Sequence, residues 1–363
     1  MDSLRAVAAL AIVWGHVLVT TQGPIWFPER ALGSGVTVFF VISGFLLYRP
    51  FAAASLGGAR AIRLRDYARR RLLRIVPAYW FALTVLTIAP GLTGLPGRDW
   101  WIYYGLAQNY ADRTRTTGIP QAWSLSVEFT FYCLLPLLAL ALATVASAAP
   151  RARGRVALGA LLAAFAITAV ATPSGLLATP FFSLDWFLLG MTLATVSVLA
   201  AGLPAEPRAI VLLRRHPGLV WAAAAAVYLV VCSQVVDPAG RPQHVLTGVF
   251  ALLVVVPAVF AGDARSVVTR VLANRVLGWL GLVSYGIFLW HGPIVLALDR
   301  TSAVTLVPHG RVVTLAVLTL ALTLVAATVS YYAVERPLLR LKERRPGAVR
   351  ASRPAVAGEA GAG

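Results

Sequence analysis

Arg5 and His16 are the two residues of the first apolar segment whose side chains could do chemistry. They are eleven residues apart, and eleven steps of about 100° return to nearly the same helix face, about 16 Å further along the axis. The stretch between them, AVAALAIVWG, carries no charge. Because a charge at mid-bilayer costs at least ~2.5 kcal/mol, both side chains are expected to point into the protein or a wet cavity. The alternative is that Arg5 is a positive-inside anchor and His16 an incidental buried residue.

Polar side chains recur at three further places inside apolar sequence. Ser43 and Gly44 fall in FFVISGF, where small residues usually let helices approach each other closely. Glu128 is the sole carboxylate of WSLSVEFTFY and precedes a long charge-free run. Tyr285 and His291 fall in SYGIFLWHGPI. Embedded ionisable groups are candidates for a functional site, although a structural ion pair is the alternative for Glu128.

A basic run, RRRLLRIVP, ends where the third apolar segment begins. Arg71 and Arg74 are three residues apart and therefore share one helix face. Two guanidiniums placed together make a fork-shaped receptor for a polyanion such as a nucleotide diphosphate. The alternative is that the run only sets membrane topology. At the far end of the chain, Glu335 closes the last apolar segment and is expected to form an interfacial salt bridge.

Composition indicates the fold class. The chain has 363 residues, of which 59% are hydrophobic and 13% charged, and its mean hydropathy is +0.77. Charge-free runs long enough to cross about 30 Å of hydrocarbon recur throughout. We therefore predict an all-α, polytopic integral membrane protein with about ten transmembrane helices. The expected spans are 4–22, 31–48, 75–94, 122–147, 156–172, 180–200, 218–236, 244–262, 276–298 and 311–334.

The distribution of positive charge predicts orientation. If the first residues are cytoplasmic, 25 of the 32 Lys and Arg residues fall on the cytoplasmic side of the expected spans. Such a bias over short loops predicts that both termini are cytoplasmic. The net charge of +18 then faces anionic lipid headgroups, and no motif for binding nucleic acid accompanies it. Residues 336–363 are expected to form a basic, disordered cytoplasmic tail.

Six phrases, taken in order along almost the whole chain, resemble the membrane-bound acyltransferase family 3. They are the R-x10-H of the first segment, FFVISGF, RRLLRIVPAYW, WSLSVEFTFY, SYGIFLWHGPI and VERP. The resemblance implies that residues 1–335 form a transmembrane acyltransferase domain of the bacterial inner membrane. It also implies transfer of an acyl group, usually acetyl, from acyl-CoA to a hydroxyl of a sugar, cell-surface glycan or glycosylated secondary metabolite. Thr37 and Phe129 stand where many relatives carry acidic residues, which bears on the acceptor class.

The residues then take these roles in the prediction. His16 is the catalytic base, oriented by Glu128, although a covalent acyl-histidine intermediate stays open. The other expected site residues are Arg5, Arg71 and Arg74 for the donor, and Ser43, Trp123, Tyr285 and His291 for the oxyanion or substrate. We expect His16, Glu128, Ser43 and an arginine to line one cavity that opens to the cytoplasm. His291 is expected to reach it from the opposite end and to contact the acceptor or the acyl chain.

The expected partners are acyl-CoA as a co-substrate, a sugar or glycoside acceptor, and the lipid bilayer. No permanently bound cofactor and no metal are expected. The alternative function is that of a transporter or flippase for a small polar or lipid-linked molecule. Such a protein typically carries inverted repeats with broken helices in matching positions, and the sequence shows no internal repeat.

Overall fold

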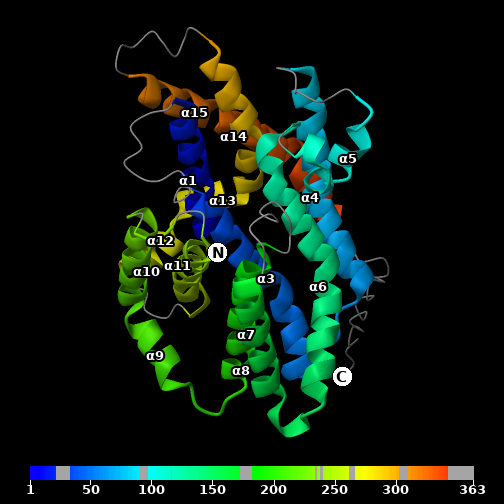
Figure 1. Ribbon diagram of the computed structural model, residues 1–363, viewed down its shortest axis with the longest axis vertical. Helices are drawn as coiled ribbons and strands as arrows, with labels where there is room; N and C mark the ends of the chain where they lie inside the picture. The colour runs from blue at the N-terminus through cyan, green and yellow to red at the C-terminus, as the bar shows by residue number, and fades with distance from the viewer. Residues whose placement is uncertain are drawn as a thin grey trace, which may run out of the picture.

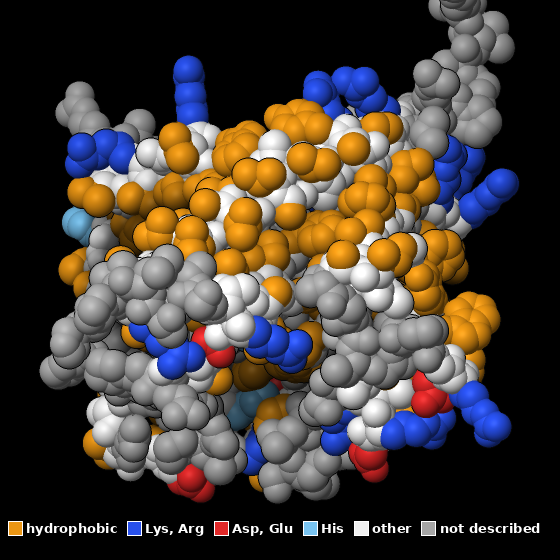
Figure 2. Space-filling view, turned by 90° about the horizontal axis from the view of Figure 1, so that it is seen from above, with side chains coloured by type: hydrophobic (Ala, Val, Ile, Leu, Met, Phe, Trp, Pro, Cys, Tyr) orange, Lys and Arg blue, Asp and Glu red, His pale blue; other side chains and the backbone are white. Residues whose placement is uncertain are grey.

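The fold is a bundle of helices, seen in a computed structural model (Figure 1). The structure describes residues 1–21, 33–89, 97–115, 117–171, 182–233, 235–237, 240–260, 266–301 and 310–341. Within these ranges the regular secondary structure is entirely helical. The space-filling view shows wide apolar surface, with Lys and Arg side chains gathered toward the edges (Figure 2). Such a distribution is typical of a protein whose apolar surface faces lipid.

Eight helices in the described part of the chain are long and apolar enough to cross a membrane. They are α1 (Asp2–Thr21), α3 (Ser34–Leu56), α4 (Leu64–Ile88), α6 (Trp123–Ser147), α7 (Arg153–Ala171), α8 (Leu184–Ala201), α11 (Arg241–Phe260) and α15 (Arg311–Ser330). Two bent pairs bring the total to ten if each pair is one span. These pairs are α9 (Arg208–Arg215) with α10 (Pro217–Cys232), and α13 (Arg275–Leu282) with α14 (Ser284–Asp299). The predicted all-α, multi-pass membrane fold is confirmed.

Several expected boundaries were wrong. Helix α4 begins at Leu64, well before the expected start at 75, because arginine is a good helix former and continues the helix beyond the apolar segment. Arg71 and Arg74 therefore lie inside a helix. Helix α3 runs on to Leu56 rather than ending at 48. The ninth expected span is bent by 68° between α13 and α14, where Gly281 packs so closely on the backbone of Asp2 that a Cβ would overlap it.

Short elements complete the described chain. They are α5 (Trp100–Tyr104), α12 (Val267–Leu272), the π-helix η7 (Tyr331–Glu335), α16 (Arg336–Leu341) and four 3₁₀ turns, at Gln108–Tyr110, Asp112–Thr114, Pro120–Ala122 and Pro150–Ala152. Trp100 and Trp101 of α5 are exposed, as is typical of aromatic residues at a membrane interface. The expected tail is helical as far as Leu341, and the rest of it, from 342 on, lies outside the described residues.

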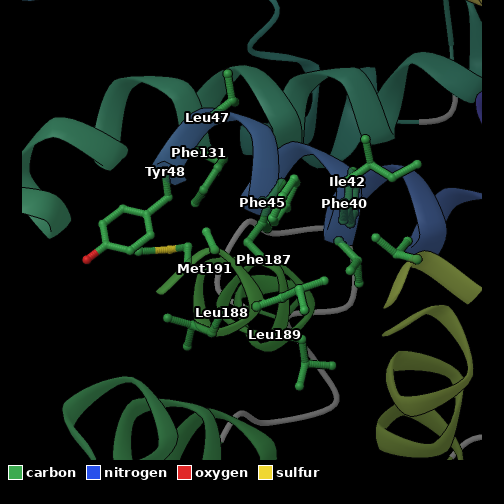
Figure 3. Close-up of a cluster of buried hydrophobic side chains, with 14 of the residues drawn as sticks. Phe40, Ile42, Phe45, Leu47, Tyr48, Phe131, Phe187, Leu188, Leu189 and Met191 are labelled. Carbon is green, nitrogen blue, oxygen red and sulfur yellow. The ribbon is translucent and has the colours of Figure 1, made fainter. Parts of the chain in front are cut away.

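A stack of three phenylalanine rings joins α3, α6 and α8 (Figure 3). The ring centroid of Phe187 lies 4.0 Å from that of Phe131 and 4.6 Å from that of Phe40. Next to this stack, α3 and α8 approach so closely that a Cβ on Gly44 or Gly190 would overlap the backbone of the other helix. Gly44 is therefore a packing residue, and this contact fixes the rotation of α3 about its axis.

A buried charged cluster joins the ends of α7, α8 and α11. The Asp185 carboxylate is fully buried and accepts hydrogen bonds from Arg241 Nη2 at 3.3 Å and His244 Nε2 at 3.0 Å. Arg241 also donates to the carbonyls of Thr168 and Ala169 in the last turn of α7, at 2.7 and 2.9 Å. The last turn of a helix in general leaves carbonyls without N–H donors from the same helix, so Arg241 caps this end of α7.

Replacing Asp185 by asparagine should strongly destabilise the protein. The substitution leaves the Arg241 guanidinium without its counter-charge, and breaking a buried pair typically costs about 3–5 kcal/mol. The measurement is the thermal unfolding midpoint of the purified protein in detergent. Asp299→Asn is the matched control, because it removes a more exposed ion pair with Arg311, which we expect to contribute at most about 1 kcal/mol. Equal shifts for the two variants would contradict the structural role of the cluster.

Candidate active site

One cavity, here called the arginine cavity, gathers five of the predicted site residues beside Tyr285. They come from four helices and are Arg5 of α1, Ser43 of α3, Arg71 and Arg74 of α4, and Glu128 of α6. Gly44 of α3 packs against α8. The adjacent residue, Ser43, therefore lies about 100° away around the axis of α3, on the side that faces α6. The predicted grouping of Ser43 and Glu128 with the arginines is therefore found in the structure.

Glu128 is held by two hydroxyl groups. Ser43 Oγ and Tyr132 OH both donate to Glu128 Oε1, the latter at 2.6 Å. Tyr132 lies one turn further along α6, at the i+4 position that a helix places beside Glu128. The described residues give the other carboxylate oxygen no hydrogen-bond partner, and that oxygen is available to the cavity.

Only one of the three arginines of this cavity forms an ion pair with a described carboxylate. Arg5 forms an ion pair with Asp2 at 3.7 Å, whereas Arg71 and Arg74 form none with any described residue. The Arg71 guanidinium lies 5.9 Å from the centroid of the Tyr132 ring, and its buried Nε has no partner. Two unpaired guanidiniums on one face suit a phosphate-bearing ligand. Across the described ranges, no group of three His, Cys, Asp or Glu side chains could hold a metal ion.

His16 lines a second cavity, here called the histidine cavity. It is lined also by Gln121 and Trp123. The two cavities share four lining residues, Ile12, Val36, Ser124 and Phe288, so they meet at these side chains. The prediction of a single cavity was therefore wrong for His16. The reason is the helix itself, since residues eleven apart are about 16 Å apart along the axis and Ile12 lies between them.

His16 is oriented by His291 and a backbone carbonyl rather than by Glu128. Its Nδ1 lies 2.9 Å from the Ile12 carbonyl oxygen and 3.3 Å from His291 Nε2. The two ring centroids are 4.8 Å apart in an edge-to-face arrangement. His291 is fully buried and is not among the lining residues of either cavity. Both expectations differ from the structure: Glu128 bonds Ser43 and Tyr132, and His291 contacts His16 and lines neither cavity.

Gln121 is a site residue that the sequence did not single out. Pro293 has no N–H, so the Leu289 carbonyl of α14 loses its usual helix partner. Gln121 Nε2 donates to that carbonyl and to the Phe288 carbonyl, each at 3.1 Å. Its amide lies so close to Gly292 that a Cβ there would overlap it. Pro293 thus frees a backbone carbonyl, and Gly292, which has no side chain, leaves room for the Gln121 amide to reach it. The proline in the sequence was the signal that could have predicted a polar partner for this carbonyl.

Three other predicted residues have defined positions. Trp123 is half-buried and lines the histidine cavity. Tyr285 donates its hydroxyl proton to the Ile75 carbonyl at 2.9 Å, and Ser43 donates to Glu128, so both protons are engaged within the protein. Glu335 is buried in the π-helix and forms no ion pair with the described residues, so the predicted salt bridge was wrong. Its neighbour Arg336 instead lies over the Tyr332 ring, 5.4 Å from the centroid.

The fold and the cavities define a polytopic helical membrane protein with ionisable side chains buried among its helices. The chain belongs to the acyltransferase family described as "Acyltransferase domain", whose model matches residues 1–333. This confirms the resemblance on the six sequence phrases and, at the level of the family, an acyltransferase domain.

Relatives in bacteria carry acetyltransferase names. The chain is 23% identical over 360 residues to "Peptidoglycan O-acetyltransferase OatA" of Listeria monocytogenes, covering 93% of this chain and 55% of the relative. It is 24% identical over 364 residues to "Putative peptidoglycan O-acetyltransferase YrhL" of Bacillus subtilis, covering 93% and 54%. The chain thus spans about half the length of these curated relatives. No solved structure matches the chain.

Replacing Gly292 by alanine should displace Gln121 and destabilise the protein. The new methyl group would overlap the Gln121 amide, so the Leu289 carbonyl would lose its donor. We expect a clear fall in the thermal unfolding midpoint, because overpacking a filled interior typically costs about 1–3 kcal/mol. Gly278→Ala is the control, since a Cβ at Gly278 of α13 meets no atom within 4 Å and favours the helix. A Gly292 variant as stable as the Gly278 variant would contradict this account.

Proposed function

We propose that the chain is a membrane O-acyltransferase that moves an acyl group, usually acetyl, from acyl-CoA to a hydroxyl of a sugar or glycan. The observation that carries the proposal is the meeting of two cavities, one rich in arginine and one lined by His16, at four shared side chains. Two substrates that react with each other need two sites whose reactive ends meet. A transporter needs one site that opens to alternate sides.

The arginine cavity is the proposed donor site. CoA carries a diphosphate and a ribose phosphate, and Arg71 and Arg74 offer two guanidinium forks that form no ion pair with any described carboxylate. Arg5 adds a third positive charge, partly offset by Asp2. The negative charge of Glu128 also acts on Arg5. We propose that Glu128, itself held by hydrogen bonds from Ser43 and Tyr132, keeps the arginines of this cavity in place. The thioester end of the donor then points toward Ile12 and Phe288.

The histidine cavity is the proposed acceptor site. Trp123 offers a flat amphipathic ring and Gln121 borders the same space, which suits a sugar carrying both apolar faces and hydroxyls. The names of the relatives, which refer to peptidoglycan O-acetylation, support a glycan acceptor. We further propose a bacterial inner-membrane location with cytoplasmic termini, on the strength of the positive-charge bias. The donor then enters from the cytoplasm and the acceptor from the opposite side.

The chemistry follows from these positions. His16 Nε2 takes the proton of the acceptor hydroxyl as its oxygen attacks the thioester carbonyl. The new C–O bond forms, the C–S bond breaks, and the proton returns from His16 to the departing CoA sulfur. Histidine carries out both transfers because it gains and loses a proton near neutral pH.

His16→Ala should insert and fold but lose transfer activity by about 10²–10⁴-fold, the usual cost of losing a general base. The measurement is CoA release together with mass spectrometry of the acetylated glycan, using purified protein in detergent. His216→Ala is the matched control, because His216 lies at the end of α9 and lines neither cavity. Near-normal turnover of the His16 variant would refute its role as base. If wild-type protein in vesicles moves a glycan across the membrane but transfers no acyl group, the result would favour the alternative function of a transporter.

Arg71→Gln and Arg74→Gln should each raise the KM for acetyl-CoA severalfold and leave the acceptor KM little changed, since ground-state donor binding is lost. Lysine at either position should restore little, because an ammonium cannot make two parallel hydrogen bonds. Arg70→Gln is the control, an exposed neighbour in the same run that lines neither cavity. If all three variants only lower the amount of inserted protein, the run serves topology alone.

A further inference from the structure

The hydrogen bonds of the two buried histidines determine where their protons lie. A carbonyl oxygen only accepts, so a ring nitrogen 2.9 Å from one must carry hydrogen. His16 Nδ1 lies at that distance from the Ile12 carbonyl, and His291 Nδ1 at the same distance from the Ile287 carbonyl. Both neutral rings are therefore protonated at Nδ1. His291 Nε2 is then a bare acceptor, and its partner at 3.3 Å is the Nδ1–H of His16.

This arrangement leaves a single ring nitrogen free at the cavity. His16 Nδ1–H is shared between the Ile12 carbonyl and His291 Nε2. His16 Nε2 has no hydrogen-bond partner among the described residues, and His16 lines the histidine cavity. A bare Nε2 with the opposite N–H held by acceptors is the form in which imidazole serves as a base.

We infer that His291 is a positioning residue for His16, acting through the lone pair on its Nε2. This inference rests on the proposed function, in which His16 is the base. When the acceptor proton reaches His16 Nε2, the ring becomes positively charged and the bond from its Nδ1–H to His291 becomes charge-assisted, and therefore stronger. His291 keeps its own proton on Nδ1 throughout, so the proton that His16 takes up is the one it returns to the CoA sulfur.

The surroundings of His291 fit this role. Its side chain is fully buried and lines neither cavity, so it acts through His16 rather than on a substrate. The next residue, Gly292, packs closely against the Gln121 amide, which is hydrogen-bonded to the Leu289 carbonyl of the same turn of α14. A neutral acceptor also suits a buried site better than a carboxylate, because a second embedded charge would carry its own desolvation cost.

The test compares His291→Leu with His291→Gln in acetyl transfer. Leucine fills a similar space but cannot accept a hydrogen bond, so kcat should fall by roughly ten- to a hundredfold while the KM for acetyl-CoA stays within about twofold. Glutamine offers an acceptor oxygen and should recover part of the rate. In a His16→Ala background, His291→Leu should leave the residual rate unchanged, because its partner is already missing. A residue that serves only packing would not show this dependence on His16.

Several results would overturn the inference. Wild-type kcat in the leucine variant would do so, as would equal losses for leucine and glutamine, or a further loss in the His16→Ala background. Should the variants fail to fold, nitrogen NMR of wild-type protein labelled at histidine still tests which ring nitrogen of His16 carries hydrogen. The His16 signals are assigned by their absence from the spectrum of His16→Ala. The expected pattern is a protonated Nδ1 and a bare Nε2 on His16, and the opposite tautomer would refute the arrangement. A wild-type protein without transferase activity would refute the proposed function instead, while the NMR result would still test the histidine pair.

Discussion

A polar side chain in an apolar helix bundle needs a partner or a water-filled cavity, and most of the site follows from that constraint. Glu128 is satisfied by Ser43 and Tyr132, so α3 and α6 are tied at the arginine cavity. His16 is satisfied by a carbonyl of its own helix and by His291, so α1 is tied to α14. In water these groups could each bond solvent, but here each bond also sets the position of a helix.

The helix packing that positions these groups is itself apolar. Gly44 brings α3 against the backbone of α8, and the phenylalanine stack continues the contact to α6. Because Gly44 and Ser43 are adjacent, packing one residue on α8 turns the other toward Glu128. The buried Asp185 cluster fixes the first turn of α8, where it joins α7 and α11. One face of each helix is committed to packing, and the remaining face is left for the cavities.

The sequence predicts much of this arrangement, and its failures have physical causes. Apolar runs identified the fold class, and the cost of embedded charge correctly grouped Ser43, Glu128, Arg71 and Arg74. The histidine pair could not be predicted, because its members lie near opposite ends of the chain and their contact depends on how α1 packs on α14. Helix ends were also misplaced, since hydropathy marks where the lipid ends and not where the helix ends.

The spacing of Arg5 and His16 on α1 matches the distance that the proposed donor would have to span. One helix of fixed pitch holds Arg5 and His16 about 16 Å apart, with Ile12 between them at the junction of the two cavities. Acyl-CoA has the same organisation, with its phosphates separated from its thioester by the pantetheine arm. Under the proposed function, α1 sets the distance between the two parts of the donor. Phosphates bound near Arg5 place the thioester at the junction of the two cavities, where His16 meets the acceptor. Inserting or deleting a residue between the two would rotate His16 by about 100° and turn it away from both His291 and the cavity.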